Sequence, residues 1–480
     1  MGVRSPSKRF FLASATAGCA GVVLIALGAL QSGSPFTTEE PGSWPFRFTT
    51  PPFSDQWFGI LMVYSGMVVL LGAWCCLGTC CPGRPLRHLY AVFAAWVAPL
   101  LFVPPLFSRD VYAYAALGQL TSRGLNPYGH SPASLHGPSF LHLVDPLWQH
   151  AHAPYGPLFM DLGRAIAPLA GNSVLAAVEA YRLIALIGVL LIAASVPTIA
   201  RSVGRQPQAA FVLAVLNPLV LLYLVGGAHN DALMLGLLVA GVAAATLRHP
   251  VVGILLCTLA AEVKIPGLIG VVFIGWAWAG QGAAPARRLK FVTLSVLIAG
   301  AAMVAVSEAS GLGWGWLSNL SDPGTVISWL DPATAAGLAT SHLLGLVGFA
   351  GHVHPIVVVF RSIGLVLAGV ITALMLVRSD RDGLPKALAL SLLAVVFLGP
   401  IVWPWYETWG IVFLAFVTSS WARWLLTGLT AVGCFATIPA HGHFTAGEVT
   451  VTIVVLGTLA LLAVVSAVGA RRQWRVASSS

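Results

Sequence analysis

Long apolar runs recur along almost the whole chain and restrict its fold more than any single motif does. Many of them approach or exceed the roughly 20 residues that a helix needs to cross the hydrocarbon core of a bilayer. Hydrophobic residues make up 58% of the sequence and charged residues only 9%, and a soluble core of this size would not need such runs. The sequence therefore predicts an all-α polytopic membrane protein that forms a single domain over residues 1–480.

The runs predict about 13 or 14 membrane-spanning helices, and the lower count applies if the short run after Val251 does not cross. Their expected first residues are Phe10, Trp57, Leu89, Val174, Ala209, Asp231, Val251, Ile265, Phe291, Ile356, Leu384, Glu407, Leu425 and Val449. Lys8 and Arg9 precede the first run as in a signal peptide, but the run is long enough to remain as an anchor.

Basic residues indicate how the chain crosses the membrane. If the N-terminus is cytoplasmic, most of the 25 Lys and Arg residues fall in loops on the cytoplasmic side, as the positive-inside rule requires. We therefore expect a multi-pass protein of the plasma (inner) membrane with both termini in the cytoplasm. The formal charge of +9 does not indicate a nucleic-acid partner, because the basic residues lie in short loops and not on a basic face with stacking aromatic residues.

A charged and aromatic segment at residues 108–114 follows one of these runs. Ser108 is placed to cap a helix that extends to Leu120, which puts Asp110 in the first turn, near free N–H groups and the positive helix end. On that helix Tyr114 would share a face with Asp110. An ionised carboxylate at the edge of the membrane is costly to keep without a function. Asp110, on the exterior side, is therefore the leading candidate for a catalytic base.

Two long exterior segments, residues 108–175 and 310–355, hold most of the remaining polar residues. The first contains several aromatic and proline residues and no low-complexity stretch, so we expect an ordered cap with short extracytoplasmic helices that includes the catalytic residue. The second is rich in tryptophan. Tryptophans at an interface usually anchor a protein in the bilayer, and sugar stacking or contact with a lipid tail is the alternative.

Other polar residues recur on the same side of the membrane. Lys264 departs from the positive-inside pattern, and an ammonium at the outer boundary needs a partner, either Glu262 or an anionic ligand such as a phosphate. His229 is more readily explained as a hydrogen-bonded interfacial histidine than as a ligand. If Asp110 is not the base, Asp145 and Asp231 are the next candidates.

The sequence predicts no metal site. His229 and Asp231 alone are too few ligands, and no compact acidic cluster is present. The pairs Cys75-Cys76 and Cys80-Cys81 have the close spacing of some zinc or redox sites. We interpret them instead as small, reduced, apolar residues at the membrane interface.

The order of these motifs resembles that of the actinobacterial polyprenyl-phosphomannose-dependent α-1,6-mannosyltransferases of lipomannan and lipoarabinomannan synthesis. The resemblance extends from about Leu89 to Glu407 and rests on residues 107–114, 124–128, 153–157, 227–230, Lys264 and 404–406. Each motif is short, but the combination and its order are specific. Asp231 departs from the pattern, because a glutamate is expected there.

The resemblance implies a GT-C type glycosyltransferase fold with its active site on the extracytoplasmic face. It implies transfer from the donor polyprenyl-phosphate-mannose to a phosphatidylinositol mannoside or lipomannan acceptor, with no cofactor. The implied donor-phosphate ligands are Lys264 first, then Arg109 and His229. The implied acceptor or sugar contacts are Tyr112, Tyr114, Asn126, Tyr128, Tyr155, Trp405 and Tyr406.

A β-mannosyl phosphate donor of this kind can yield an α-mannoside by one in-line displacement with inversion, for which a single base is sufficient. Because the donor carries no pyrophosphate, we expect no metal ion. A multi-span secondary transporter or a flippase of a glycolipid remains the alternative, although a transporter should place its polar residues near the bilayer midplane in related repeats. The point along the mannan at which such an enzyme acts, proximal or distal, stays open.

Overall fold

The computed structural model describes residues 8–31, 34, 36–37, 44, 57–328, 330–346 and 353–436, and the elements along these residues are helices. They are α1 (Lys8–Leu30), α2 (Trp57–Cys80), α3 (Leu86–Val97), η1 (Ala98–Phe102), α4 (Asp110–Ser122), η2 (Pro132–Ser134), η3 (Leu141–Leu143), α5 (Pro146–Gln149), α6 (Pro157–Ala170), α7 (Val174–Ser202), α8 (Pro207–Ala214), η4 (Val220–Gly226), α9 (Asp231–Thr246), α10 (Pro250–Val263), η5 (Ile265–Gly267), α11 (Leu268–Trp278), α12 (Pro285–Ser310), η6 (Gly315–Thr325), α13 (Pro332–Leu346), α14 (Val353–Asp382), α15 (Leu384–Leu398), α16 (Glu407–Leu414) and α17 (Ser420–Phe435).

The all-α polytopic architecture is confirmed. Five described helices are long and apolar enough to cross a membrane, namely α1, α2, α7, α12 and α14, and a sixth arises if η4 and α9, bent by 117° at their junction, count as one broken span. Every predicted run except the one at Val449, which lies outside the described residues, coincides with a helix. Several of these helices are short, so the count of 13 or 14 complete spans stays a prediction.

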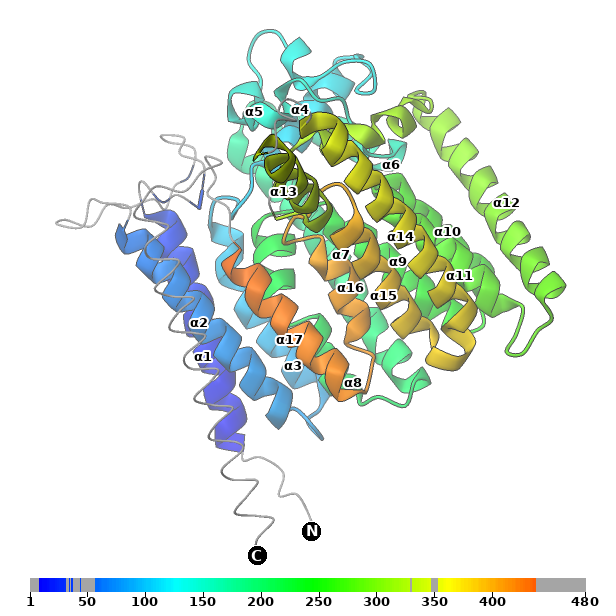
Figure 1. Ribbon diagram of the computed structural model, residues 1–480. Coiled ribbons are helices and arrows are strands. Elements are labelled where there is room, and N and C mark those ends of the chain that lie inside the picture. Colours follow the sequence, from blue (N-terminus) through cyan, green and yellow to red (C-terminus); the bar gives the residue numbers. More distant parts are fainter. Residues whose placement is uncertain are drawn as a thin grey trace, which may run out of the picture.

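Helices α7 and α9 pack closely because glycines face each other across their contact. A Cβ atom on Gly188 would lie 2.2 Å from the carbonyl oxygen of Ala232, and one on Gly236 would lie 2.3 Å from that of Gly188. Small residues allow helix backbones to approach in this way. In Figure 1, α7 and α9 lie within the bundle, α1 and α2 form a pair along one side, and α12 lies at the opposite edge.

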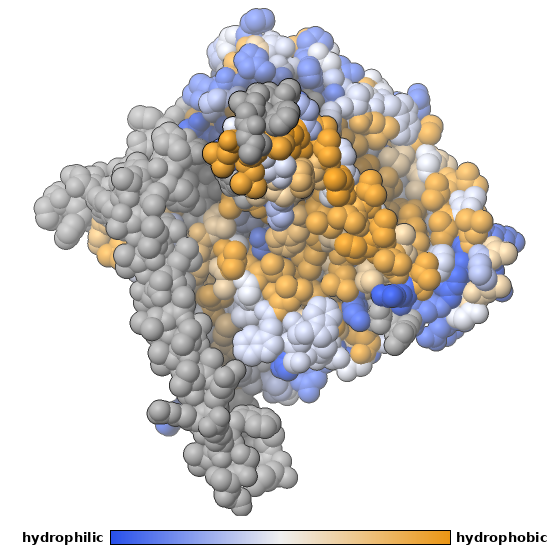
Figure 2. Space-filling model, in the orientation of Figure 1, coloured by the Kyte–Doolittle hydropathy of each residue, from blue (hydrophilic) through white to orange (hydrophobic). Residues whose placement is uncertain are grey.

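The two ends of the bundle differ. Residues 108–173, with α4, α5 and α6, gather at one end, which we call the capped end (Figure 1). Helices α9 and α16 begin there and α10 ends there. The opposite end carries the loops at 203–206, 247–249, 279–284 and 415–419. In Figure 2 apolar residues cover the middle of the visible face and polar residues gather toward both ends, as expected for a protein that crosses a bilayer.

Candidate active site

Asp110 lies at the first position of α4, as the sequence predicted to within one residue. The residue at the cap position is Arg109 and not Ser108, but the Ser108 hydroxyl still accepts a hydrogen bond from the Asp110 N–H at 3.1 Å. The Asp110 side chain is 18% exposed. This residual exposure matters because it opens the carboxylate to a cavity.

The cavity beside Asp110 has about 530 Å³ of space, part of it open to solvent, and its walls come from four separate segments of the capped end. Its lining residues are Asp110, Ala113, Leu117, Pro132, Trp148, Ala151, His152, Pro154, Tyr155, Trp403 and Tyr406. The structure therefore brings three predicted site residues, Asp110, Tyr155 and Tyr406, to one cavity. Trp403, Trp148 and His152 are wall residues that we had not assigned to the site.

Burial shifts the acidity of this carboxyl group. It raises the pKa of Asp110 to about 6, the Lys264 ammonium opposes the shift, and the carboxylates of Asp231 and Asp145 add to it. The group is therefore largely ionised at neutral pH and yet has a pKa close to that pH. General bases work best in this range.

His229 lies against Asp110. Its ring Nδ1 is 3.6 Å from Asp110 Oδ2, and its imidazole stacks on the Trp405 ring with centroids 4.1 Å apart at 20°. The side chain is fully buried, and neither ring nitrogen has a hydrogen-bond partner among the described residues. Trp405, which we had predicted to contact sugar, does not line the cavity and instead holds His229 in place.

Lys264 pairs with Asp231 and not with Glu262. Its Nζ lies 2.9 and 3.0 Å from the two Asp231 carboxylate oxygens, and the Trp409 indole N–H donates to one of these oxygens at 2.7 Å. The same ammonium lies 4.2 Å from the centre of the Tyr406 ring. The hypothesis of a Glu262 partner is therefore wrong. Glu262 is buried elsewhere, against the backbone at Gly156.

Backbone strain is concentrated beside this cluster. Phe107 and Ala228 have φ of 63° and 54° and are two of the three non-glycine residues with positive φ in the described part of the chain. They immediately precede Ser108 and His229. Such strain typically persists at functional sites, where the surrounding structure holds it.

Tyr114 and Tyr112 lie in the core of the capped end and do not line the cavity. The Tyr114 hydroxyl donates to Asn230 Oδ1 at 3.3 Å, and its ring packs edge-on against Tyr155 with centroids 5.5 Å apart. Tyr114 thus supports the cavity wall from behind. Tyr112 points to another side of α4, as its two-residue spacing from Asp110 requires, and is 3% exposed.

Three other predicted residues also lie away from the cavity. Asn126 donates to the Leu312 carbonyl at 2.9 Å and accepts from the Tyr128 N–H at 2.9 Å. Tyr128 is 7% exposed, and its carbonyl accepts a hydrogen bond from Asn319. This pair therefore ties the capping segments together. Arg109, half-buried, does not line the cavity either.

Two family models match the chain. One is described as "Alpha-(1->6)-mannopyranosyltransferase, N-terminal domain" and matches residues 15–280. The other, described as "MptB C-terminal domain", matches residues 333–468. The chain belongs to the α-(1→6)-mannopyranosyltransferase family.

Other members of this family align over most of the chain. It is 32% identical to a probable α-(1→6)-mannopyranosyltransferase of Mycolicibacterium smegmatis over 96% of this chain and 89% of the relative. It is 34% identical to α-(1→6)-mannopyranosyltransferase A of Mycobacterium tuberculosis, with 82% and 78% covered, and 29% identical to α-(1→6)-mannopyranosyltransferase B of Corynebacterium glutamicum, with 86% and 74% covered. No solved structure matches the chain significantly. The Asp110 cavity is thus a candidate active site for mannosyl transfer.

Proposed function

We propose that this chain transfers mannose from polyprenyl-phosphate-mannose to the α-1,6-mannan backbone of lipomannan and lipoarabinomannan precursors, as an inverting GT-C type glycosyltransferase. The observation that supports this most directly is the Asp110 carboxylate, which opens into an aromatic-walled cavity and lies within the electrostatic influence of the partly buried Lys264. The names of the relatives supply the sugar and the linkage. The motif resemblance supplies the lipid-linked donor.

In the proposed reaction Asp110 accepts the proton of an acceptor hydroxyl as that oxygen attacks the mannose C1 carbon. The bond between C1 and the phosphate oxygen breaks on the opposite face, and the lipid phosphate leaves as an anion. One displacement inverts a β-mannosyl phosphate to an α-mannoside. A single base is sufficient for this step, and within the cavity lining Asp110 supplies the one carboxylate.

The leaving phosphate needs a positive charge or N–H donors to stabilise its developing charge. A lysine ammonium has three N–H donors. Two of the Lys264 N–H donors are used by the Asp231 carboxylate oxygens, which leaves the third N–H for a phosphate oxygen. In this proposal Asp231 holds the ammonium in place. Tyr406 contacts Lys264 and also lines the cavity, so it would lie between the donor phosphate and the sugar. His229 and Arg109 remain secondary candidates.

The cavity wall suits a sugar. Tyr155, Trp403 and Trp148 present rings to the same space, and aromatic rings offer large, rigid apolar surfaces with a polar edge. Asp231 is a poor alternative base, because it is fully buried and bound by Lys264 and Trp409. Asp145 is also engaged, since it caps α5 by accepting the Leu147 N–H at 3.0 Å.

We place the capped end on the extracytoplasmic side of the plasma membrane and both termini in the cytoplasm, as the distribution of basic residues predicts. Metal independence is part of the proposal and follows from the chemistry of a donor without a pyrophosphate. The polar cluster lies at the ends of α4, α9 and α10 and not at mid-helix, which favours an enzyme at the membrane surface over a transporter with a midplane site.

The test is a transfer assay on the purified full chain reconstituted in sealed lipid vesicles. Radiolabelled polyprenyl-phosphate-mannose and GDP-mannose are offered separately with a phosphatidylinositol mannoside acceptor, with and without EDTA, and the product linkage is determined. We expect α-1,6 transfer from the lipid donor alone and no effect of EDTA. Transfer from GDP-mannose alone, or movement of the mannosyl lipid across the bilayer without formation of a glycosidic bond, would contradict the proposal.

A further inference from the structure

A second polar site lies at the opposite end of the molecule, far from Asp110 along the helices. It is a cavity between α2, α8 and α17 with about 990 Å³ of space, part of which is open to solvent. The residues that line it include Trp74, Arg205, Ala209, Leu213, Arg423 and Trp424. Nothing in the proposed transfer reaction uses it.

Two guanidinium groups share this cavity. One Arg205 nitrogen donates to the Val417 carbonyl at 2.7 Å, while its Nε is buried and has no hydrogen-bond partner among the described residues. Arg423, from the first turn of α17, is exposed. Burial and the neighbouring charge of Arg423 both lower the pKa of Arg205. The two charges therefore lie close enough to repel each other.

No carboxylate compensates this repulsion in the described part of the chain. The ion pairs formed there involve Arg164, Arg182, His229, Lys264, Arg288 and Arg361, and neither arginine of this cavity. Two adjacent guanidinium groups without an acidic partner favour a bound anion, and their planar N–H donors match phosphate oxygens in particular.

The walls indicate what else the ligand carries. Ala209 and Leu213 give the cavity an apolar side, Trp74 lies at its base, and Trp424, 78% exposed, stands at its rim. Tryptophans exposed in this way typically lie at the level of lipid headgroups. A phosphate that is joined to acyl chains fits both parts of this site.

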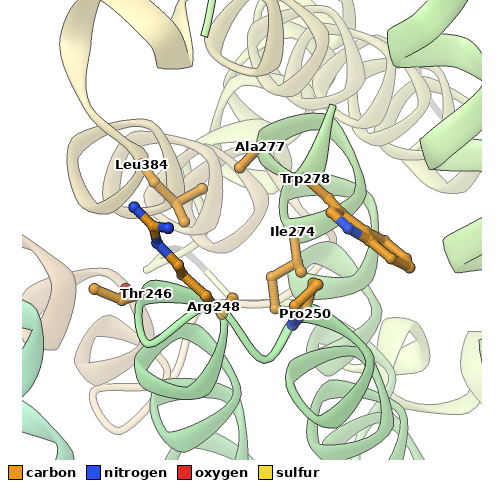
Figure 3. A pocket seen from close by; sticks show the side chains of 8 residues that line it. Thr246, Arg248, Pro250, Ile274, Ala277, Trp278 and Leu384 are labelled. Atoms are coloured by element: carbon orange, nitrogen blue, oxygen red, sulfur yellow. The ribbon is translucent and has the colours of Figure 1, made fainter. Parts of the chain in front are cut away.

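Another cavity at the same end provides a comparison. Figure 3 shows Arg248 and Trp278 on either side of a space of about 860 Å³ that Ile274, Pro250 and Leu384 also line. It combines an arginine and a tryptophan in the same way but has only one guanidinium group. Arg248 can therefore serve as an internal control for the effect of a single cation beside an apolar wall.

We propose that the cavity of Arg205 and Arg423 binds the headgroup phosphate of an anionic membrane lipid. The lipid would join α2, α8 and α17 at the end of the molecule opposite the active site. Lipid binding at this cavity does not depend on the proposed transfer reaction, so evidence against either proposal does not affect the other.

The test is titration of the purified full chain, in a neutral detergent, with short-chain phosphatidylglycerol, followed by native mass spectrometry and thermal unfolding. Each lost guanidinium contact is expected to weaken binding about tenfold. We therefore expect Arg423→Gln to raise the apparent Kd by about that factor, and Arg205→Gln combined with Arg423→Gln to raise it further. Because Arg423 is exposed, its single variant keeps the test valid even if the Arg205 variant does not fold.

The control is Arg87→Gln combined with Arg201→Gln, which removes the same charge from exposed positions at the same end. We expect this variant and Arg248→Gln to bind phosphatidylglycerol like the original chain. An equal loss of affinity in either control would overturn the proposal in favour of diffuse charge attraction. Glycerol phosphate that competes at the same concentration as phosphatidylglycerol would also overturn it, because the ligand would then be a soluble phosphate.

Discussion

The chemistry of Asp110 depends on opposing effects on one carboxyl group. Burial favours its neutral form, and Lys264 favours its charged form. The sequence predicted this residue because a carboxylate at a helix start is unusual in a chain with so little charge. The position at a helix start predicted an environment that favours the ionised form, whereas burial by segments distant along the chain raises the pKa instead.

The activity should therefore depend on pH near the pKa of Asp110. Because burial raises that pKa to about 6, protonation removes the base below this pH, and kcat/KM should fall about tenfold per pH unit on the acid side. Initial transfer rates from pH 4.5 to 8 measure the profile. A rate that stays constant from pH 7 down to pH 5 would contradict the assignment.

The partner of Lys264 shows a limit of inference from sequence. Glu262 is two residues away, but residues with this spacing do not face each other at the end of a helix. Asp231 is 33 positions away and reaches Lys264 because α9 begins where α10 ends. Trp409 completes the cluster from α16. We had assigned it no role, and no spacing rule connects it to the other two residues.

Lys264→Met should leave the Asp231 carboxylate buried without its cation and reduce the free energy of unfolding by about 3–5 kcal/mol. Combining Lys264→Met with Asp231→Asn should restore much of this stability. It should not restore transfer, because the donor phosphate would still lack its ammonium. Thermal unfolding and transfer rates are measured on the same preparations, and recovery of both in the double variant would exclude the phosphate-binding role.

At the scale of the elements, the apolar runs predicted where the helices lie but not how long each helix is. The run expected at Ala209 is broken into α8 and the π-helix η4. Pro218 lacks the N–H that a continuous helix requires, and the Asn217 side chain accepts the Leu219 N–H at 2.9 Å. Hydropathy does not register such breaks. Residues 226–229, which follow this irregular stretch, lie at the capped end.

The contact of α7 with α9 positions His229 and Asp231, so widening it should impair the site. Gly236→Ala places a methyl group against the α7 backbone and should lower the free energy of unfolding by about 1–3 kcal/mol. Transfer should fall with it. Gly300→Ala in α12 is the matched control, since nothing lies within 4 Å of its added Cβ. Equal behaviour of the two variants in thermal unfolding would contradict this account.

For the whole molecule, the ordered cap was predicted from the length and composition of residues 108–175, and its internal contacts were not. Asn126 and Tyr128, which the resemblance assigned to substrate, instead join this cap to Leu312, just before η6, and to Asn319 of η6. Motif residues cannot be separated into substrate contacts and scaffold by sequence alone, because both kinds are polar and both lie on the exterior.

Asn319 of η6 donates to the carbonyl oxygens of Tyr128 and Ala153, both at 3.2 Å. Asn319→Ala should weaken the cap by about 1–3 kcal/mol, since two hydrogen bonds are lost. Hydrogen exchange at residues 126–157 should rise while exchange in α7 stays unchanged. Ser321→Ala, an exposed position of the same helix, is the control, and an equal rise in that variant would contradict the role of Asn319.

The central claim is that Asp110 is the base of mannosyl transfer. The most direct measurement compares transfer from polyprenyl-phosphate-mannose by the original chain, by Asp110→Asn and by Asp145→Asn, each verified as folded. We predict that Asp110→Asn keeps its shape and lowers turnover by at least roughly 100-fold, whereas Asp145→Asn retains most activity. Near-normal turnover by a well-folded Asp110→Asn protein would contradict the claim.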